Sequence, residues 1–239
     1  MANILAIETS SDALSVSLKF EDEEYHFHEI APRQHTERLL GVIEKILNDA
    51  KANLKDLDAI GVGCGPGSFT GIRLACSIAQ GLAFSSDLKT IQVSSLEVLA
   101  EGIQRFFNKK LTRVLSLVDC GRDKIYAGNF SYIDEKIVNS KLEIVDLSNF
   151  RSWYPFYDLN PTETFFLTGR VDIVEEYRLI SSPHILYKTL VHQTNEFKLP
   201  RAEDLLNICI ERFNSSEVLN PSELLPIYLS DEAQWKKLK

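Results

Sequence analysis

The chain lacks the histidine and cysteine spacings that metal and thiol-exchange sites use. No C-x-x-C pair occurs, and no histidine is followed by another at the helical spacing of four residues. His26 and His28 share one face of an expected strand, but no third ligand accompanies them. We therefore expect no metal and no cofactor. Buried free thiols are expected at Cys64, Cys76, Cys120 and Cys209.

Basic residues are scarce as well. Twenty-six lysines and arginines stand against thirty-four aspartates and glutamates, which gives a formal net charge of −8. Because affinity for a phosphate backbone comes mainly from clustered cations, this balance argues against tight binding of nucleic acid by the chain alone. No apolar run approaches the roughly 20 residues of a membrane span, and no cationic leader precedes the first strand. We expect a cytoplasmic protein that does not enter a membrane.

What the chain does contain is a glycine-punctuated segment, GVGCGPGSFTGIR, that leads into a helix of small and apolar residues. On a helical wheel for residues 69–84, the polar side chains share one narrow sector: Thr70, Arg73, Ser77 and Gln80. The rest of the wheel is apolar or small, so the helix must be covered over most of its circumference. Another backbone is expected close to the small residues.

The glycine loop lies where a phosphate-binding turn would, but its spacing does not match one. A P-loop needs a Lys-Ser or Lys-Thr pair after its second spaced glycine, and the chain has no Gly-Lys dipeptide. The dinucleotide pattern G-x-G-x-x-G fails too, since counting on from Gly65 and Gly67 reaches Thr70. We favour tight turns and close packing as the role of these glycines, with phosphate binding as the alternative.

Hydrophobic periodicity predicts elements in the order βββαβαβα over the first part of the chain. The expected strands and helices are, in chain order, 3–8, 13–19, 25–30, 35–50 (helix), 59–64, 69–84 (helix), 90–93 and 95–107 (helix). This order is typical of the α/β architecture of actin-like ATPases (ASKHA) and ribonuclease H, in which a mixed sheet is flanked by helices.

A second lobe is expected after residue 108. Residues 1–108 would form the first actin-like lobe, and residues 109–239 a smaller and divergent lobe, again with a mixed sheet flanked by helices. Its expected elements are strands at 113–118, 124–130 and 164–168 and an amphipathic helix at 201–213. The pattern is weak between residues 131 and 182.

Short segments along the whole chain together resemble the TsaB (YeaZ) family. They are 4–10 (ILAIETS), 32–40 (PRQHTERLL), 65–73 (GPGSFTGIR), 79–83 (AQGLA), 93–96 (VSSL), 200–206 (PRAEDLL), 226–229 (PIYL) and 235–238 (WKKL). The resemblance implies an actin-like fold and a noncatalytic scaffold and activator in making threonylcarbamoyladenosine (t6A). This modified adenosine lies beside the anticodon of tRNAs that read codons beginning with A.

The resemblance also implies partners. The chain would dimerise with the catalytic subunit TsaD, which transfers the threonylcarbamoyl group, and would pair with itself as a homodimer. A TsaE-type ATPase and tRNA would join only in the assembled complex. The chain departs from the family after residue 118, where Cys120, Gly121 and Lys124 stand in place of the usual residues. No role is carried over to that turn.

The helices at 35–50 and 69–84 are expected to form the partner interface, because each carries more apolar surface than one packing face requires. The expected contacts are His35, Thr36, Leu39, Leu40, Ile43, Phe69, Thr70, Arg73, Leu74, Ser77 and Ile78. The alternative is that both helices simply pack on their own sheet.

Two further sites follow from position in the chain. Glu8, Thr9 and Ser10 occupy the hairpin that handles phosphate in actin-like kinases, and we interpret them as vestigial. The alternative is an independent ATP-dependent kinase or ATPase, for which Asp119 is the best candidate for a second carboxylate. A peptidase function lacks the residues it needs.

In the C-terminal tail, Trp235, Lys236 and Lys237 offer a possible tRNA contact, although a solvated terminus is the plainer interpretation.

Overall fold

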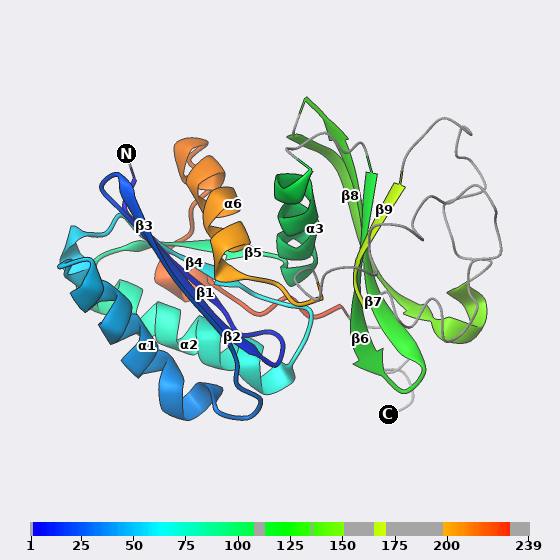
Figure 1. Cartoon of the computed structure of the whole chain (residues 1–239), viewed down its shortest axis with the longest axis horizontal. Coiled ribbons are helices and arrows are strands. Elements are labelled where there is room, and N and C mark those ends of the chain that lie inside the picture. The colour runs from blue at the N-terminus through cyan, green and yellow to red at the C-terminus, as the bar shows by residue number, and fades with distance from the viewer. Residues whose placement is uncertain (1, 108–112, 135, 151–164, 171–197, 230–239) are drawn as a thin grey trace. The chain divides into compact units, whose positions relative to one another are not determined.

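The structure, a computed structural model, describes residues 2–107, 113–134, 136–150, 165–170 and 198–229. The chain divides into two compact units. One contains residues 1–102 and 199–227, and the other contains residues 103–198 and 228–239. Each unit is built on its own mixed β-sheet (Figure 1). None of the helices in the described ranges is long and apolar enough to cross a membrane.

The first unit has a five-stranded sheet in the order β3-β2-β1-β4-β5. Its strands are β1 (Ile4–Glu8), β2 (Ala13–Phe20), β3 (Glu23–Ile30), β4 (Ala59–Gly63) and β5 (Lys89–Val93). β1, β2 and β3 are antiparallel neighbours, whereas β4 runs parallel to both β1 and β5. The two hairpins explain the antiparallel half, and the helical crossovers between β3, β4 and β5 explain the parallel half.

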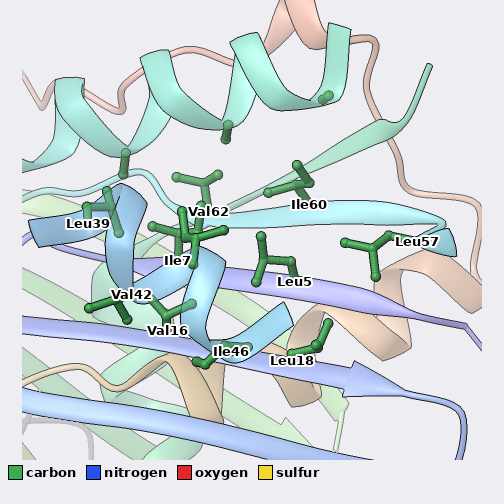
Figure 2. Packing of buried hydrophobic residues seen from close by; sticks show 14 of the residues in the cluster. Leu5, Ile7, Val16, Leu18, Leu39, Val42, Ile46, Leu57, Ile60 and Val62 are labelled. Atoms are coloured by element: carbon green, nitrogen blue, oxygen red, sulfur yellow. The ribbon is translucent and has the colours of Figure 1, made fainter. Parts of the chain in front are cut away.

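Helices cover both faces of this sheet, because alternate residues of its central strands are apolar on each side. Leu5 and Ile7 of β1 face a cluster formed with α1 (His35–Asp49) and α2 (Phe69–Ser86), as Figure 2 shows. Ile4 and Ala6 face the opposite cluster, formed with α6 (Ala202–Asn214) and Val98 of α3 (Ser95–Phe106). The order βββαβαβα of the first lobe is confirmed.

The helix α6 belongs to the first unit and not to the second. Its residues Leu205, Leu206 and Cys209 are fully buried in the cluster on the first sheet. The domain boundary expected at residue 108 had placed this helix in the other lobe, so its packing corrects that assignment. The first unit is formed by two separate stretches of the sequence, so no single boundary can divide the chain into its two units.

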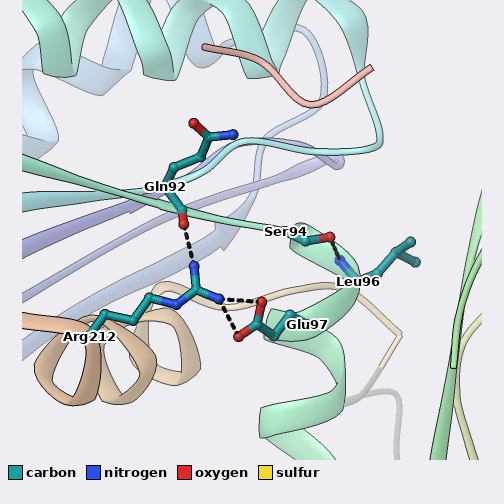
Figure 3. A network of polar contacts seen from close by, with 5 residues as sticks. All are labelled: Gln92, Ser94, Leu96, Glu97 and Arg212. Carbon is teal, nitrogen blue, oxygen red and sulfur yellow. Dashed lines mark hydrogen bonds and ion pairs between the residues drawn. The ribbon is translucent and has the colours of Figure 1, made fainter. Parts of the chain in front are cut away.

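A polar network fastens α6 to its neighbours in the first unit. Figure 3 shows Arg212, near the end of α6, donating to the backbone oxygen of Gln92 and to both carboxylate oxygens of Glu97. The two bonds to Glu97 measure 2.7 and 2.8 Å. Burial raises the pKa of Glu97, and the Arg212 guanidinium opposes that increase. The ion pair therefore orders the start of α3 against α6.

The residues after α6 form an extended segment that returns along the first sheet. Leu219 exchanges backbone hydrogen bonds with Thr90 of the edge strand β5. The Leu224 oxygen accepts from the Gln80 side chain, at 3.0 Å, and the Ile227 amide donates to the Cys64 oxygen. The segment thereby covers the edge of β5.

The second unit has a four-stranded sheet in the order β8-β7-β6-β9. Its strands are β6 (Arg113–Gly121), β7 (Lys124–Ile133), β8 (Lys136–Asp146) and β9 (Phe165–Gly169), with β6 and β9 parallel. The sequence did not predict β8, because the first half of this edge strand is exposed on both faces and shows no alternation. Three short 3-10 helices, η1 (Leu54–Asp56), η2 (Leu147–Asn149) and η6 (Pro221–Glu223), complete the described elements.

Candidate functional site

The hairpin between β1 and β2 packs directly on the start of α2. Thr9 Oγ1 donates to the Gly71 oxygen at 2.8 Å, and the Ser68 amide donates to the Ser10 oxygen at 2.6 Å. A Cβ atom on Gly71 would lie 1.9 Å from the Thr9 oxygen. The expectation that a backbone lies close to the small residues of α2 is confirmed, and close packing is the role of this glycine.

Glu8 fills the space beneath this hairpin. Its side chain is fully buried, with Oε1 accepting from the Ser10 amide at 2.6 Å and Oε2 accepting from Ser95 Oγ at 3.0 Å. A Cβ atom on Gly63 would lie 1.9 Å from Glu8 Oε2, so the carboxyl group needs a glycine at that position of β4. The Ser95 hydroxyl also accepts from the Gly65 amide at 3.2 Å, which ties α3 to the glycine loop.

The environment of Glu8 makes its carboxyl group a weaker acid than an ordinary glutamate. Desolvation raises its pKa from 4.5 to about 7, against the opposing effect of the hydrogen bonds from Ser10 and Ser95. The Ser10 amide, which an open phosphate hairpin would present to its ligand, donates instead to this carboxyl group. The hydrogen bonds of Glu8, Thr9 and Ser10 described above are thus all made to groups of the chain itself.

Asp119, the proposed second carboxylate, has partners within the second unit. Its Oδ1 accepts from the Gly121 amide at 2.7 Å, and its Oδ2 accepts from Arg170 Nη1 at 3.0 Å. The first bond closes the turn between β6 and β7, where Gly121 has a φ of +74°. The second fixes the end of β6 to the residue that follows β9. Both are structural uses of a carboxylate.

The outward surface of α1 and α2 collects most of the expected interface residues, and we call it the α1–α2 face. Leu40 is 55% exposed and Phe69 is 57% exposed. Leu74 and Ile78 are half-buried against the core. The remaining exposed members are polar: Thr36, Thr70, Arg73 and Ser77. The two helices bring these residues together on one side of the sheet.

Three of the expected interface residues have other partners. Leu39 and Ile43 are 0% and 3% exposed, and both pack into the core of their own unit. The sequence-based assignment of these two side chains to the interface is therefore wrong for the folded chain, because the sheet beneath α1 takes up that part of its apolar stripe. His35 is half-buried, with Nε2 3.0 Å from the Ala13 oxygen, and helps to attach the start of α1 to β2.

Two features of the α1–α2 face escaped the sequence analysis. The Arg73 guanidinium lies 3.7 Å from the centre of the Phe69 ring, in cation–π geometry. Phe84, which is 84% exposed, lies two helical turns beyond Ser77 on α2. The helical wheel contained a signal for Phe84, since residues seven apart share nearly the same angle.

One predicted site, the possible tRNA contact in the C-terminal tail, cannot be placed. Trp235, Lys236 and Lys237 lie outside the described residues. In the part of the chain that the structure describes, no three His, Cys, Asp or Glu side chains gather in a way that could hold a metal ion. His26 instead lies 3.0 Å from Ser17 Oγ.

Comparison with known sequences connects this geometry to a family. A family model described as TsaD, tRNA N6-adenosine threonylcarbamoyltransferase, matches residues 27–149. The "tRNA threonylcarbamoyladenosine biosynthesis protein TsaB" of Haemophilus influenzae is 30% identical, over 98% of this chain and 96% of its own length. The chain belongs to the TsaB (YeaZ) family. The Escherichia coli protein of the same name is also 30% identical, over 98% of this chain and 97% of its own length.

Solved structures of TsaB (YeaZ) relatives agree with this assignment. YeaZ from Pseudomonas aeruginosa superimposes with a TM-score of 0.79 and 30% identity, covering 96% of this chain and all (100%) of that chain. A second P. aeruginosa structure, described as an uncharacterized protein with similarity to peptidase YeaZ, gives a TM-score of 0.81 at 29% identity with the same coverage. The predicted family and the predicted α/β actin-like fold with two mixed sheets are thereby confirmed.

Proposed function

We propose that this chain is a noncatalytic subunit of the machinery that makes t6A in tRNA, and that its α1–α2 face binds the catalytic TsaD subunit. The names of the full-length relatives support the pathway. The exposed apolar side chains of Leu40 and Phe69, on helices that otherwise cover the sheet, carry the proposal for the face. Aromatic residues and arginine are enriched at protein interfaces, and Phe69 with the stacked Arg73 has this composition.

A scaffold and activator role accounts for the closed hairpin. Two amides that could meet a phosphate are used within the chain: the Ser10 amide donates to Glu8, and the Ser68 amide donates to the Ser10 oxygen. The candidate second carboxylate, Asp119, is held by Arg170. These contacts favour a partner subunit over an independent ATP-dependent kinase or ATPase, which remains the competing function.

The same face serves two partners in this proposal. In the absence of TsaD it pairs with a second copy of the chain, and TsaD displaces that copy in the cytoplasm. Burying about 1,600 Å² in total, a standard interface, is within reach of two helices. A TsaE-type ATPase and tRNA join only the assembled complex, and the tail residues Trp235, Lys236 and Lys237 are the proposed tRNA contact of this chain.

A matched pair of surface variants tests the face. Leu40→Glu places a carboxylate on α1, and Val138→Glu makes a comparable change on β8 at a side chain that is likewise 55% exposed. We expect Leu40→Glu to weaken binding to TsaD at least tenfold and to lower t6A formation at limiting concentration. Val138→Glu should bind as the wild type does. Equal affinities for both variants would place the interface elsewhere.

The competing ATPase function needs a separate measurement. The chain alone, incubated with ATP and magnesium, should release no phosphate above the level of a Glu8→Gln variant. Glutamine keeps the shape of the side chain and an acceptor for the Ser10 amide, so this control avoids a cavity. Hydrolysis that depends on Glu8 would establish the ATPase, whatever the result of the binding test.

A further inference from the structure

Two of the four cysteines lie in contact in the core of the first unit. The sulfur atoms of Cys64 and Cys76 are 3.7 Å apart, and both side chains are buried. Cys64 follows directly after β4, and Cys76 lies within α2. Cys209 is buried beside Gly61, and Cys120 in the second unit is partly exposed. The sequence, in which Cys64 and Cys76 are twelve residues apart, gave no sign of the contact.

The backbone around the pair is held in place on both sides. The Cys64 amide donates to the Val93 oxygen at 2.8 Å, and the Cys64 oxygen accepts from the Ile227 amide at 2.8 Å. Cys76 is fixed by the helix around it. A disulfide has its sulfurs about 2.0 Å apart, so side-chain rotation and a small shift of α2 must bring the two atoms roughly 1.7 Å closer. Preorganisation of this kind favours reaction within the pair over reaction with a distant thiol.

We infer that Cys64 and Cys76 are an oxidisable dithiol, at which a hydroperoxide forms a disulfide between the end of β4 and α2. The Cys76 thiolate attacks one peroxide oxygen, the O–O bond breaks, and the leaving hydroxide takes a proton to become water. The Cys64 thiolate then attacks the sulfur of the resulting sulfenic acid, the S–O bond breaks, and a second water leaves. The two thiols lose two electrons, and hydrogen peroxide gains them as it becomes two waters.

The order of these steps follows from the pair itself. The contact between the two thiols lowers the pKa of Cys76 and, together with burial, raises the pKa of Cys64. This asymmetry favours Cys76 as the first nucleophile, and exchanging the roles of the two cysteines gives the same disulfide. Because both side chains are buried, the reaction proceeds through local opening at the start of α2 and is slow.

The bridge would enclose the glycine loop and about the first two turns of α2, including Phe69 and Arg73. It would make these turns stiffer and would reverse under reducing conditions, as a transient regulatory disulfide does. The inference concerns the chemistry of this chain alone and does not depend on the proposed partner.

Peptide mapping of the oxidised full chain tests it. Trypsin cleaves after Lys55, Arg73 and Lys89, so the two cysteines fall on separate peptides, 56–73 and 74–89. The chain is treated with hydrogen peroxide until Cys120, the partly exposed thiol, has been oxidised, and free thiols are then alkylated in denaturant. We expect one linked peptide pair whose mass is about 2 Da below the sum of the two thiol peptides, and separate peptides after reduction.

Variants control the assignment. Cys64→Ala, checked for folding by circular dichroism, should abolish the linked pair, and Cys209→Ala should leave it unchanged; Cys76→Ala replaces Cys64→Ala if that variant does not fold. Two outcomes overturn the inference. Either both cysteines remain alkylatable after Cys120 has been oxidised, or they are converted separately to sulfinic acids without a link.

Discussion

The inner and outer sides of α2 differ in how much space they leave around their side chains. On the inner side, Gly71 lies so close to the Thr9 oxygen that no side chain fits, and Glu8 fills the remaining space under the hairpin. On the outer side, Phe69 and Phe84 are more than half exposed. The hairpin side is filled by the chain's own groups, whereas the outer side leaves two aromatic rings exposed. This difference supports the proposal that the chain binds a partner through the outer surface of α2 and not a ligand at the hairpin.

The largest effect is expected where a charge enters the closed side. Ile43→Glu would bury a carboxylate in the core of the first unit and should lower the free energy of unfolding by about 4 kcal/mol or prevent folding. Leu40→Glu, three residues earlier on the same helix, should change it by less than about 0.5 kcal/mol. Urea titrations of both variants measure the difference. Similar stabilities would mean that α1 does not pack as described.

A methyl group is enough to test the close approach of the hairpin. Gly71→Ala would place Cβ against the Thr9 oxygen, and we expect a loss of roughly 3 kcal/mol because backbone must move. Gly81 on the same helix has nothing within 4 Å of the added atom, so Gly81→Ala should gain up to about 1 kcal/mol from helix propensity. Thermal melts of the two variants should therefore shift in opposite directions. A neutral Gly71→Ala would show that the hairpin can lift from α2.

The sequence predicted the first unit well, because its strands and helices repeat apolar residues at periods of two and near 3.6. It could not separate Leu39 from Leu40, since both lie in one broad apolar stripe and only the position of the sheet decides which is covered. It also missed the contact of Glu8 with Ser95, which joins residues 87 apart in the chain. Contacts between distant segments leave no periodic signal, and α6 was assigned to the wrong unit for the same reason.

Titration of Glu8 offers a test that depends on pH. Its pKa is about 7 in the folded chain and 4.5 as the ordinary value, so the folded state keeps a proton that the unfolded state releases between these pH values. Its stabilising contribution is thus fully present below about pH 4.5 and is lost as the pH rises to about 7. Relative to Glu8→Gln, the wild type should lose on the order of 3 kcal/mol across this window. A constant difference between the two proteins from pH 4.5 to 8 would rule out the shifted pKa.

The smallest expected effect lies on the open side, at the stacked pair of Arg73 and Phe69. An exposed cation–π contact is worth about 0.5 to 1 kcal/mol, so Arg73→Ala should reduce the stability of the free chain by no more than that. A double-mutant cycle with Phe69→Ala measures the coupling energy. Once Phe69 has been replaced, Arg73→Ala should cause no further loss from this contact.

Binding to TsaD should respond more strongly, because the guanidinium and the ring would be desolvated together at the interface. Arg73→Lys keeps the charge but loses the planar stacking, so its affinity for TsaD should lie between those of the wild type and Arg73→Ala. If Arg73→Ala costs as much stability in the free chain as it costs in binding, then the pair serves the fold of α2 and not a partner.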